Sequence, residues 1–263
     1  MRLPVMSGVI DRRMLVNYRV DPVVMAGLLP PPFRPKLHRG FGLAGICLIR
    51  LKQIRPSFLP SWIGISSENA ATRFAVEWDD GDRRREGVYI RRRDTSNWLN
   101  AMAGGRLFPG IHSHGRFRSD ETDGHLDFSM RSDDGSTSVE LSAGVAKSWP
   151  AGSVFESLEE ASAFFAAGSL GYSATPDRTR FQGLELHCET WNVEPLAVRS
   201  VQASYFDDPS VFPKGSIHFD CALLMRGIAH EWHGKPDLCF SNAQAVATLA
   251  AVNTSGAESA LHR

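Results

Sequence analysis

The chain has 263 residues, and its 29 basic and 29 acidic side chains give a formal net charge of zero. Nucleic-acid-binding proteins usually carry a basic excess, so we expect no nucleic-acid partner. No run of about 18 apolar residues is present, and the first residues lack a signal-peptide core, so we expect no membrane contact and a cytoplasmic location. Only five basic residues are lysines, which matters because lysine can act as a nucleophile and arginine cannot.

The first predicted element is a short helix over residues 21–29. Asp21 is a suitable N-cap and Pro22 fits the first turn, while three prolines end the helix. Residues 41–51 are rich in Ile and Leu and predict a buried strand.

A hairpin is predicted next. Residues 70–79 alternate in polarity at strand period, and an Asp/Gly turn leads to a second strand over 85–92. Arginines 83–85 and 91–93 bracket this second strand among acidic residues, which is typical of a solvated hairpin.

The second half of the chain predicts more strands around one capped helix. Residues 95–103 resemble a short helix that two glycines end. Ser157 and Glu160 form a capping box that begins a helix ending at Gly168. The remaining strands are predicted over 106–119, 125–132, 137–147, 183–203 and 216–228, with an extended segment over 230–238.

We therefore predict one α+β domain, mostly antiparallel β, over residues 1–239. Residues 240–263 are rich in Ala, Ser and Asn, have few large apolar side chains, and predict a flexible tail. The cysteines lack compact ligand spacing, and Cys47 lies in an apolar segment where a thiol usually packs.

The strongest candidate site is the predicted strand that contains two histidines. His112, His114 and Arg116 share one strand face. Such a face could bind an anion, hold a metal or transfer protons. The alternative is the exposed face of an edge strand, where these side chains meet water.

Glu68 is the second candidate. In one unbroken register it shares a strand face with Phe74, Val76 and Trp78, and an apolar face raises a carboxyl pKa toward that of an acid/base catalyst. The alternatives are a bend whose backbone the carboxylate satisfies, or a register break that exposes Glu77 instead. Arg19, at the end of a predicted strand, suits a substrate carboxylate, although a surface ion pair is the commoner fate.

Long motifs along the chain resemble the uncharacterised YqjF-like family of the acetoacetate decarboxylase-like superfamily. The resemblance covers about Arg13 to Cys239 and rests on NYRVDP, LLPPPFRPKL, LAGICLIRLK, GISSENAATR, VEWDDG, EGVYIRRRDTS, NAMAGGRLFPG, AGSLGYSA and HEWHGKPDLC. It implies a conical, mostly antiparallel β-barrel with short flanking helices and an interior cavity for a small molecule.

The resemblance also implies where the chemistry differs. Acetoacetate decarboxylases form a Schiff base on a lysine of a Gly-x-Pro-Lys-Lys segment, whereas the corresponding residues 104–114 contain no lysine. Arg106 stands in this segment but cannot replace the amine. Glu68 resembles the superfamily's catalytic glutamate in position, and Arg19 resembles its N-terminal substrate-contacting arginine.

Our leading hypothesis is an enzyme that acts on a small carboxylate or carbonyl compound without a lysine Schiff base. Arg19, Arg106 or Arg116 would hold the anion, and His112, His114 and Glu68 would transfer protons. We predict no cofactor; if a divalent metal binds, the two histidines would be its ligands. The alternative is a binding protein that has kept only the cavity. A homo-oligomer is compatible with either function.

Overall fold

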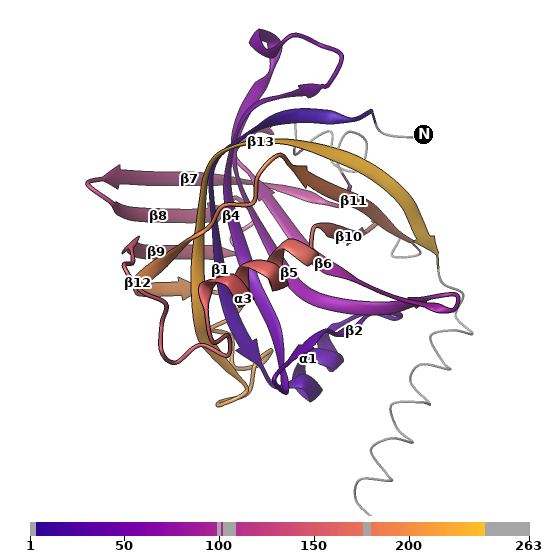
Figure 1. The fold of residues 1–263 in the computed structure, drawn as a ribbon, viewed down its shortest axis with the longest axis vertical. Helices are drawn as coiled ribbons and strands as arrows, with labels where there is room; N and C mark the ends of the chain where they lie inside the picture. The colour runs from indigo at the N-terminus through magenta and orange to yellow at the C-terminus, as the bar shows by residue number, and fades with distance from the viewer. Residues whose placement is uncertain (1–3, 99–100, 102–108, 176–179, 240–263) are drawn as a thin grey trace, which may run out of the picture.

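The computed structural model describes residues 4–98, 101, 109–175 and 180–239. It is mostly β-sheet (Figure 1). The helical elements are α1 (Pro22–Leu28), the 3-10 helix η1 (Ser61–Ile63) and α3 (Leu158–Ala167). The strands are β1 (Met6–Val20), β2 (Arg34–Pro35), β3 (Leu37–His38), β4 (Phe41–Pro56), β5 (Ile65–Asp80), β6 (Arg83–Thr95), β7 (His112–Thr122), β8 (His125–Ser132), β9 (Ser138–Val145), β10 (Leu170–Ala174), β11 (Arg180–Cys188), β12 (Glu194–Ala203) and β13 (Ile217–Cys239).

The strands form one 13-stranded sheet that closes on itself. The long strands β13, β1, β4, β5 and β6 are consecutive neighbours, and β11 pairs with both β10 and β13 to complete a ring. Within the described residues the pairings are antiparallel except those of β6 with β10 and with β7. The predicted fold class, a mostly antiparallel β protein with a few short helices, is confirmed.

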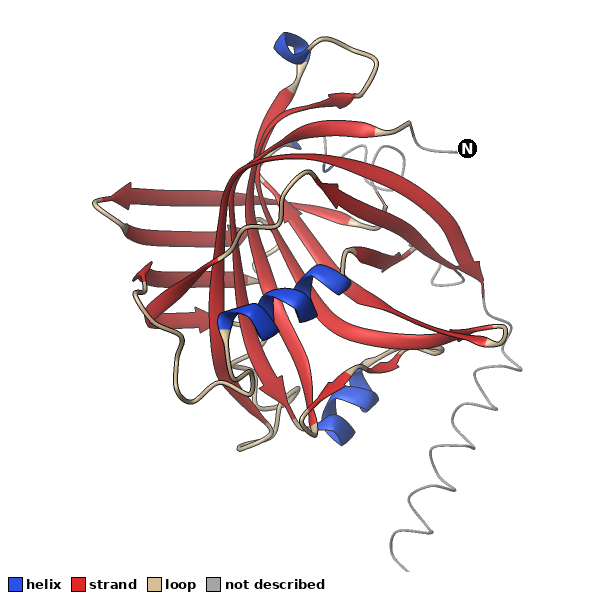
Figure 2. Ribbon diagram, in the orientation of Figure 1, coloured by secondary structure: helices blue, strands red, loops and turns tan. Residues whose placement is uncertain are grey.

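The long strands β1, β4 and β5 bury apolar side chains on both faces. One face packs in a core with Met14, Phe74 and Trp78, and the other in a core with Leu15 and Phe165. The second face lies under α3, which crosses the long strands (Figure 2). Burial on both faces explains why β4 appears in the sequence as a nearly continuous apolar run.

Both predicted helix caps are confirmed. The Asp21 carboxylate accepts hydrogen bonds from the first turn of α1, and the Ser157 hydroxyl accepts one from the backbone N–H of Glu160. The hairpin of β5 and β6 is also confirmed.

Three predicted boundaries are wrong. Thr95 ends β6 and does not start the predicted helix 95–103. Trp98 and Ala101 are helical, whereas residues 99–100 and 102–103 lie outside the described residues. The segment 183–203 is divided between β11, which pairs with β10 and β13, and β12, which pairs with β9 and with another part of β13. Residues 216–238, predicted as two pieces, are joined in the single strand β13, which pairs with β12, β1 and β11. In addition, no helix within the described ranges is long and apolar enough to cross a bilayer.

Candidate functional site

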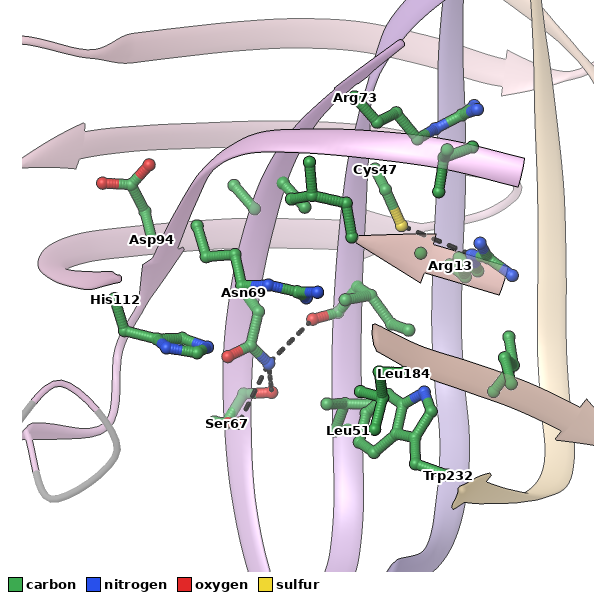
Figure 3. A pocket seen from close by; sticks show the side chains of 18 of the residues that line it. Arg13, Cys47, Leu51, Ser67, Asn69, Arg73, Asp94, His112, Leu184 and Trp232 are labelled. Atoms are coloured by element: carbon green, nitrogen blue, oxygen red, sulfur yellow. Dashed lines mark hydrogen bonds between the residues drawn. The ribbon is translucent and has the colours of Figure 1, made fainter. Parts of the chain in front are cut away.

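A cavity of about 130 Å³ lies on the α3 side of the long strands. Its walls come from β1, β4, β5, β6, β10, β11 and β13, from the first residue of β7, and from the two residues after α3. One part of the wall is apolar and includes Leu51, Leu184 and Trp232 (Figure 3). An engineered apolar cavity of about 150 Å³ holds benzene, so this volume suits a ligand of about six non-hydrogen atoms.

Three arginines line this cavity without a carboxylate partner. Arg13, Arg73 and Arg93 come from β1, β5 and β6, and none of them forms an ion pair with any described residue. Arg13 donates instead to the sulfur of Cys47 at 3.3 Å, and Arg93 donates to the Ser173 hydroxyl at 3.3 Å. The cavity therefore carries uncompensated positive charge.

Burial acts strongly on two of these arginines. It lowers the pKa of Arg73 to about 10 and that of Arg93 to about 10, so both remain cationic at neutral pH. The charge of Arg13 contributes to the lowered pKa of Arg73, which indicates that the two guanidinium groups lie near each other. Buried cations are costly unless an anion accompanies them.

The polar wall contains a neutral histidine beside two small polar side chains. The His112 ring faces Asn69 and Ser67 in Figure 3. Burial, reinforced by the charge of Arg93, lowers the pKa of His112 to about 3. The Asn69 amide nitrogen donates to the Ser67 hydroxyl at 2.9 Å, which fixes the orientation of its side chain. A neutral imidazole in this position can donate or accept a hydrogen bond, but a pKa this low makes it a weak base.

Asp94 is the one carboxylate among the residues that line the cavity. It accepts a hydrogen bond of 2.8 Å from Arg92, which also pairs with Asp134 at 3.0 Å. Burial raises the pKa of Asp94. Because Arg92 already compensates its charge, Asp94 does not neutralise the three cavity arginines.

The sequence from residue 10 to residue 220 matches the model of the DUF2071 family, which is described as an uncharacterized conserved protein. The chain belongs to this family. No curated protein matches the sequence. The narrower YqjF-like assignment stays a prediction that rests on the sequence motifs.

Solved structures similar to this fold are acetoacetate decarboxylase-like. The acetoacetate decarboxylase of Legionella pneumophila has a TM-score of 0.56 at 12% identity, with 89% of this chain and 87% of that chain covered. An acetoacetate decarboxylase-like enzyme of Sphingomonas wittichii RW1 has a TM-score of 0.56 at 11% identity, with 92% and 94% covered. The enduracididine biosynthesis enzyme MppR, complexed with pyruvate, has a TM-score of 0.52 at 12% identity, with 92% and 91% covered. At these identities the similarity shows the fold.

The structure separates the two predicted histidines by environment. His112 lines the cavity, whereas His114 contacts Asp133 through Nδ1 at 2.7 Å and has a side chain that is 29% exposed. The Arg116 side chain is 89% exposed. No group of three or more metal-ligating side chains occurs among the described residues, and a metal at the two histidines stays a prediction.

Glu68 and Arg19 do not line the cavity. Glu68 keeps the predicted register, with its face in the core of Phe74, but it binds Arg12 and Arg50 in an ion-pair network. Arg19 donates to the backbone carbonyl of Gly152 at 2.7 Å. Arg106 lies outside the described residues.

Most of the charged residues that line the cavity were not predicted from the sequence. Arg93 was predicted in a solvated hairpin. Residues 79–86 and Arg91 of this hairpin are exposed, but Arg93 is half-buried and lines the cavity. Arg13 and Arg73 were not predicted as site residues; the one local signal for them is a charged residue within a largely buried strand. None of the five lysines, all of which are described, lines the cavity.

Proposed function

We propose that the cavity binds a small carboxylate and that the protein is an enzyme acting on a small oxo acid without a lysine Schiff base. The observation that carries this proposal is the group of three cavity arginines, Arg13, Arg73 and Arg93, without an ion-pair partner among the described residues. A ligand carboxylate would supply the missing negative charge. Guanidinium groups suit this role because their planar donors match the two carboxylate oxygens.

The size of the cavity narrows the ligand class. About 130 Å³ accommodates an acid of about three or four carbons. The apolar wall near Trp232 and Leu184 suits a short alkyl end, while the arginines suit the carboxylate. That the similarly folded MppR is complexed with pyruvate supports an oxo acid of this size.

The proposed chemistry is proton transfer on the bound oxo acid. A bound carboxylate would offset the charge of Arg93, which is one cause of the lowered pKa of His112, and would so make the imidazole a stronger base for the proton on the carbon beside the carbonyl group. The cavity arginines would stabilise the negative charge that then develops on the carbonyl oxygen. Of the catalytic residues predicted from the sequence, His112 is the one retained here. Anion binding is assigned to Arg13, Arg73 and Arg93, in place of Arg19 or Arg116.

The proposal is tested by titration and turnover with pyruvate and acetoacetate, each compared with acetone as an uncharged ligand. We expect stoichiometric binding of the acids and none of acetone. Arg93→Met should weaken acid binding by about 10- to 100-fold, since a hydrogen bond to a charged group contributes about 1.5–3 kcal/mol. Arg116→Met is the matched control, because Arg116 is exposed.

Two outcomes would contradict the proposal. Equal binding of acids and acetone would contradict the carboxylate site. Stoichiometric binding of acids that are recovered unaltered would overturn the enzymatic part and support a binding protein. Thermal unfolding of Arg93→Met, with and without a saturating acid, shows whether weaker binding reflects the site or loss of the fold.

A further inference from the structure

We propose that Cys47 is a nucleophilic site in the cavity, selective for small carboxylates that carry an electrophilic carbon. This inference rests on the proposed anion site, because the same arginines would attract the reagent. Cys47 was expected only to pack in the core; the structure places its side chain in the cavity wall of β4, next to Arg13 (Figure 3).

The first supporting observation is the contact between the thiol and a cation. Arg13 Nε donates to Cys47 Sγ at 3.3 Å, and the same guanidinium packs over the Trp191 ring at 5.4 Å. Reactive thiols in proteins occur in accessible, electropositive surroundings, because the thiolate is the nucleophile. Cys47 is itself buried, with 7% exposure in the core of Leu15, but its side chain lines a cavity whose walls carry this positive charge.

A second, independent observation points to a ligand at this place. Arg73 lines the same cavity, is 7% exposed, and has an Nε atom without a hydrogen-bond partner among the described residues. A buried guanidinium donor without an acceptor is costly. A carboxylate bound there would accept this hydrogen bond and would lie in the cavity that Cys47 also lines.

The other described thiols lack this combination. Cys221 is buried and outside the cavity lining, and Cys188 is half-buried, likewise outside it. Burial raises the pKa of both thiols, so both stay protonated at neutral pH. Cys47 is thus the described cysteine with both a cavity and cationic neighbours.

Two reactions follow from this placement. With an α-halo acid, the S–C bond forms as the carbon–halogen bond breaks, the halide leaves with the bonding pair, and the thiol proton passes to solvent. With an α-oxo acid, sulfur bonds to the carbonyl carbon, the π electron pair moves to oxygen, and that oxygen takes the proton lost by the thiol. The second product is a reversible hemithioketal.

The test compares alkylation by iodoacetate and by iodoacetamide, which are similar in size and differ in charge. Peptide mapping by mass spectrometry gives the rate at each cysteine. We expect the ratio of iodoacetate rate to iodoacetamide rate at Cys47 to be at least tenfold higher in the native protein than in the urea-unfolded protein. Pyruvate should slow the native reaction with iodoacetate at Cys47 and not at Cys188.

Two variants test whether the preference of Cys47 for iodoacetate depends on Arg13. Arg13→Gln should lower the ratio of the iodoacetate rate to the iodoacetamide rate at Cys47 toward the ratio of the unfolded protein. Cys188→Ser is the matched control and should leave the ratio at Cys47 unchanged. A native ratio equal to that of the unfolded protein, or an unreactive Cys47, would overturn the inference.

The two proposals fail in different ways. If carboxylates bind in the titration but Cys47 shows no charge preference, the anion site stands and the nucleophilic site is wrong. If Cys47 prefers iodoacetate but no oxo acid binds or reacts, the proposed function is wrong. Because the pyruvate competition uses the wild-type chain, a folding defect in Arg13→Gln leaves the inference testable.

Discussion

Arg73 of β5 donates a 2.5 Å hydrogen bond to the Oδ1 atom of Asn17 of β1, across the intervening strand β4. Gly45 is the β4 residue in register with both. A Cβ atom at this position would lie 3.2 Å from Asn17 Oδ1. The glycine therefore leaves room for the buried guanidinium to reach its amide acceptor, and this contact holds one of the cavity cations in place.

We expect Asn17→Asp to weaken carboxylate binding by about tenfold or more, because a resident carboxylate would neutralise Arg73 and compete with the ligand. The same change removes the amide donor to the Leu15 carbonyl, at a cost of about 1 kcal/mol. Titration with pyruvate measures the affinity, and urea unfolding measures the stability. The exposed Asn192→Asp serves as the control, and unchanged affinity in Asn17→Asp would argue against Arg73 as an anion-binding residue.

Glu68→Gln should lower the free energy of unfolding by about 1–3 kcal/mol, since Glu68 accepts charged hydrogen bonds of 2.7 Å from Arg12 and 2.6 Å from Arg50. Arg12 is fully buried, so it depends on its acidic partners. Urea unfolding is the measurement. Glu156→Gln, which removes an exposed ion pair with Arg39, should cost less than about 1 kcal/mol. Lost turnover with unchanged stability in Glu68→Gln would instead restore the acid/base role predicted from the sequence.

Protein stability should fall as the pH drops from 7 toward 4, partly because of His230. Burial lowers the pKa of His230 from 6.5 to about 4, so the unfolded chain binds this proton at a higher pH than the folded protein does. The full contribution is about 3 kcal/mol. In His230→Phe, the decrease in the free energy of unfolding between pH 7 and pH 4 should be smaller than in the wild type by about 3 kcal/mol. His218→Ala, at an exposed position, should show the same decrease as the wild type. Urea unfolding over this pH range measures the free energy of unfolding. If it varies with pH in the same way in the wild type and in His230→Phe, His230 is not a cause of the pH dependence.

Borohydride treatment in the presence of pyruvate should leave every lysine unmodified. A Schiff base requires an unprotonated lysine amine at the substrate, and no lysine lines the cavity. Lys36, Lys52 and Lys235 instead form ion pairs with Glu86, Asp11 and Glu185. Intact-protein mass spectrometry is the measurement, with a lysine-dependent acetoacetate decarboxylase as the positive control. A reduced pyruvate adduct on any lysine would contradict the expected chemistry.

Local sequence signals determined the secondary structure wherever the physical cause is itself local. The caps at Asp21 and Ser157 could be predicted because each side chain bonds to backbone groups within three residues. Alternating polarity located β5, but it left the face of Glu68 open between an unbroken register, a bend and a register break. The absence of a lysine from residues 104–114 likewise needed only the sequence, and from it we predicted that the Schiff-base mechanism of acetoacetate decarboxylases does not apply.

Only the tertiary structure decided which charges meet in the cavity. Arg13, Arg73 and Arg93 belong to three different strands, and their convergence depends on the register of β1, β4, β5 and β6. Glu68 and Arg73 belong to the same strand, yet Glu68 faces Arg12 while Arg73 lines the cavity. A sequence gives the charge of each residue, but the neutralising partner comes from strands distant in sequence. The long-range pairing therefore determines whether an arginine forms an ion pair or stays available for a ligand.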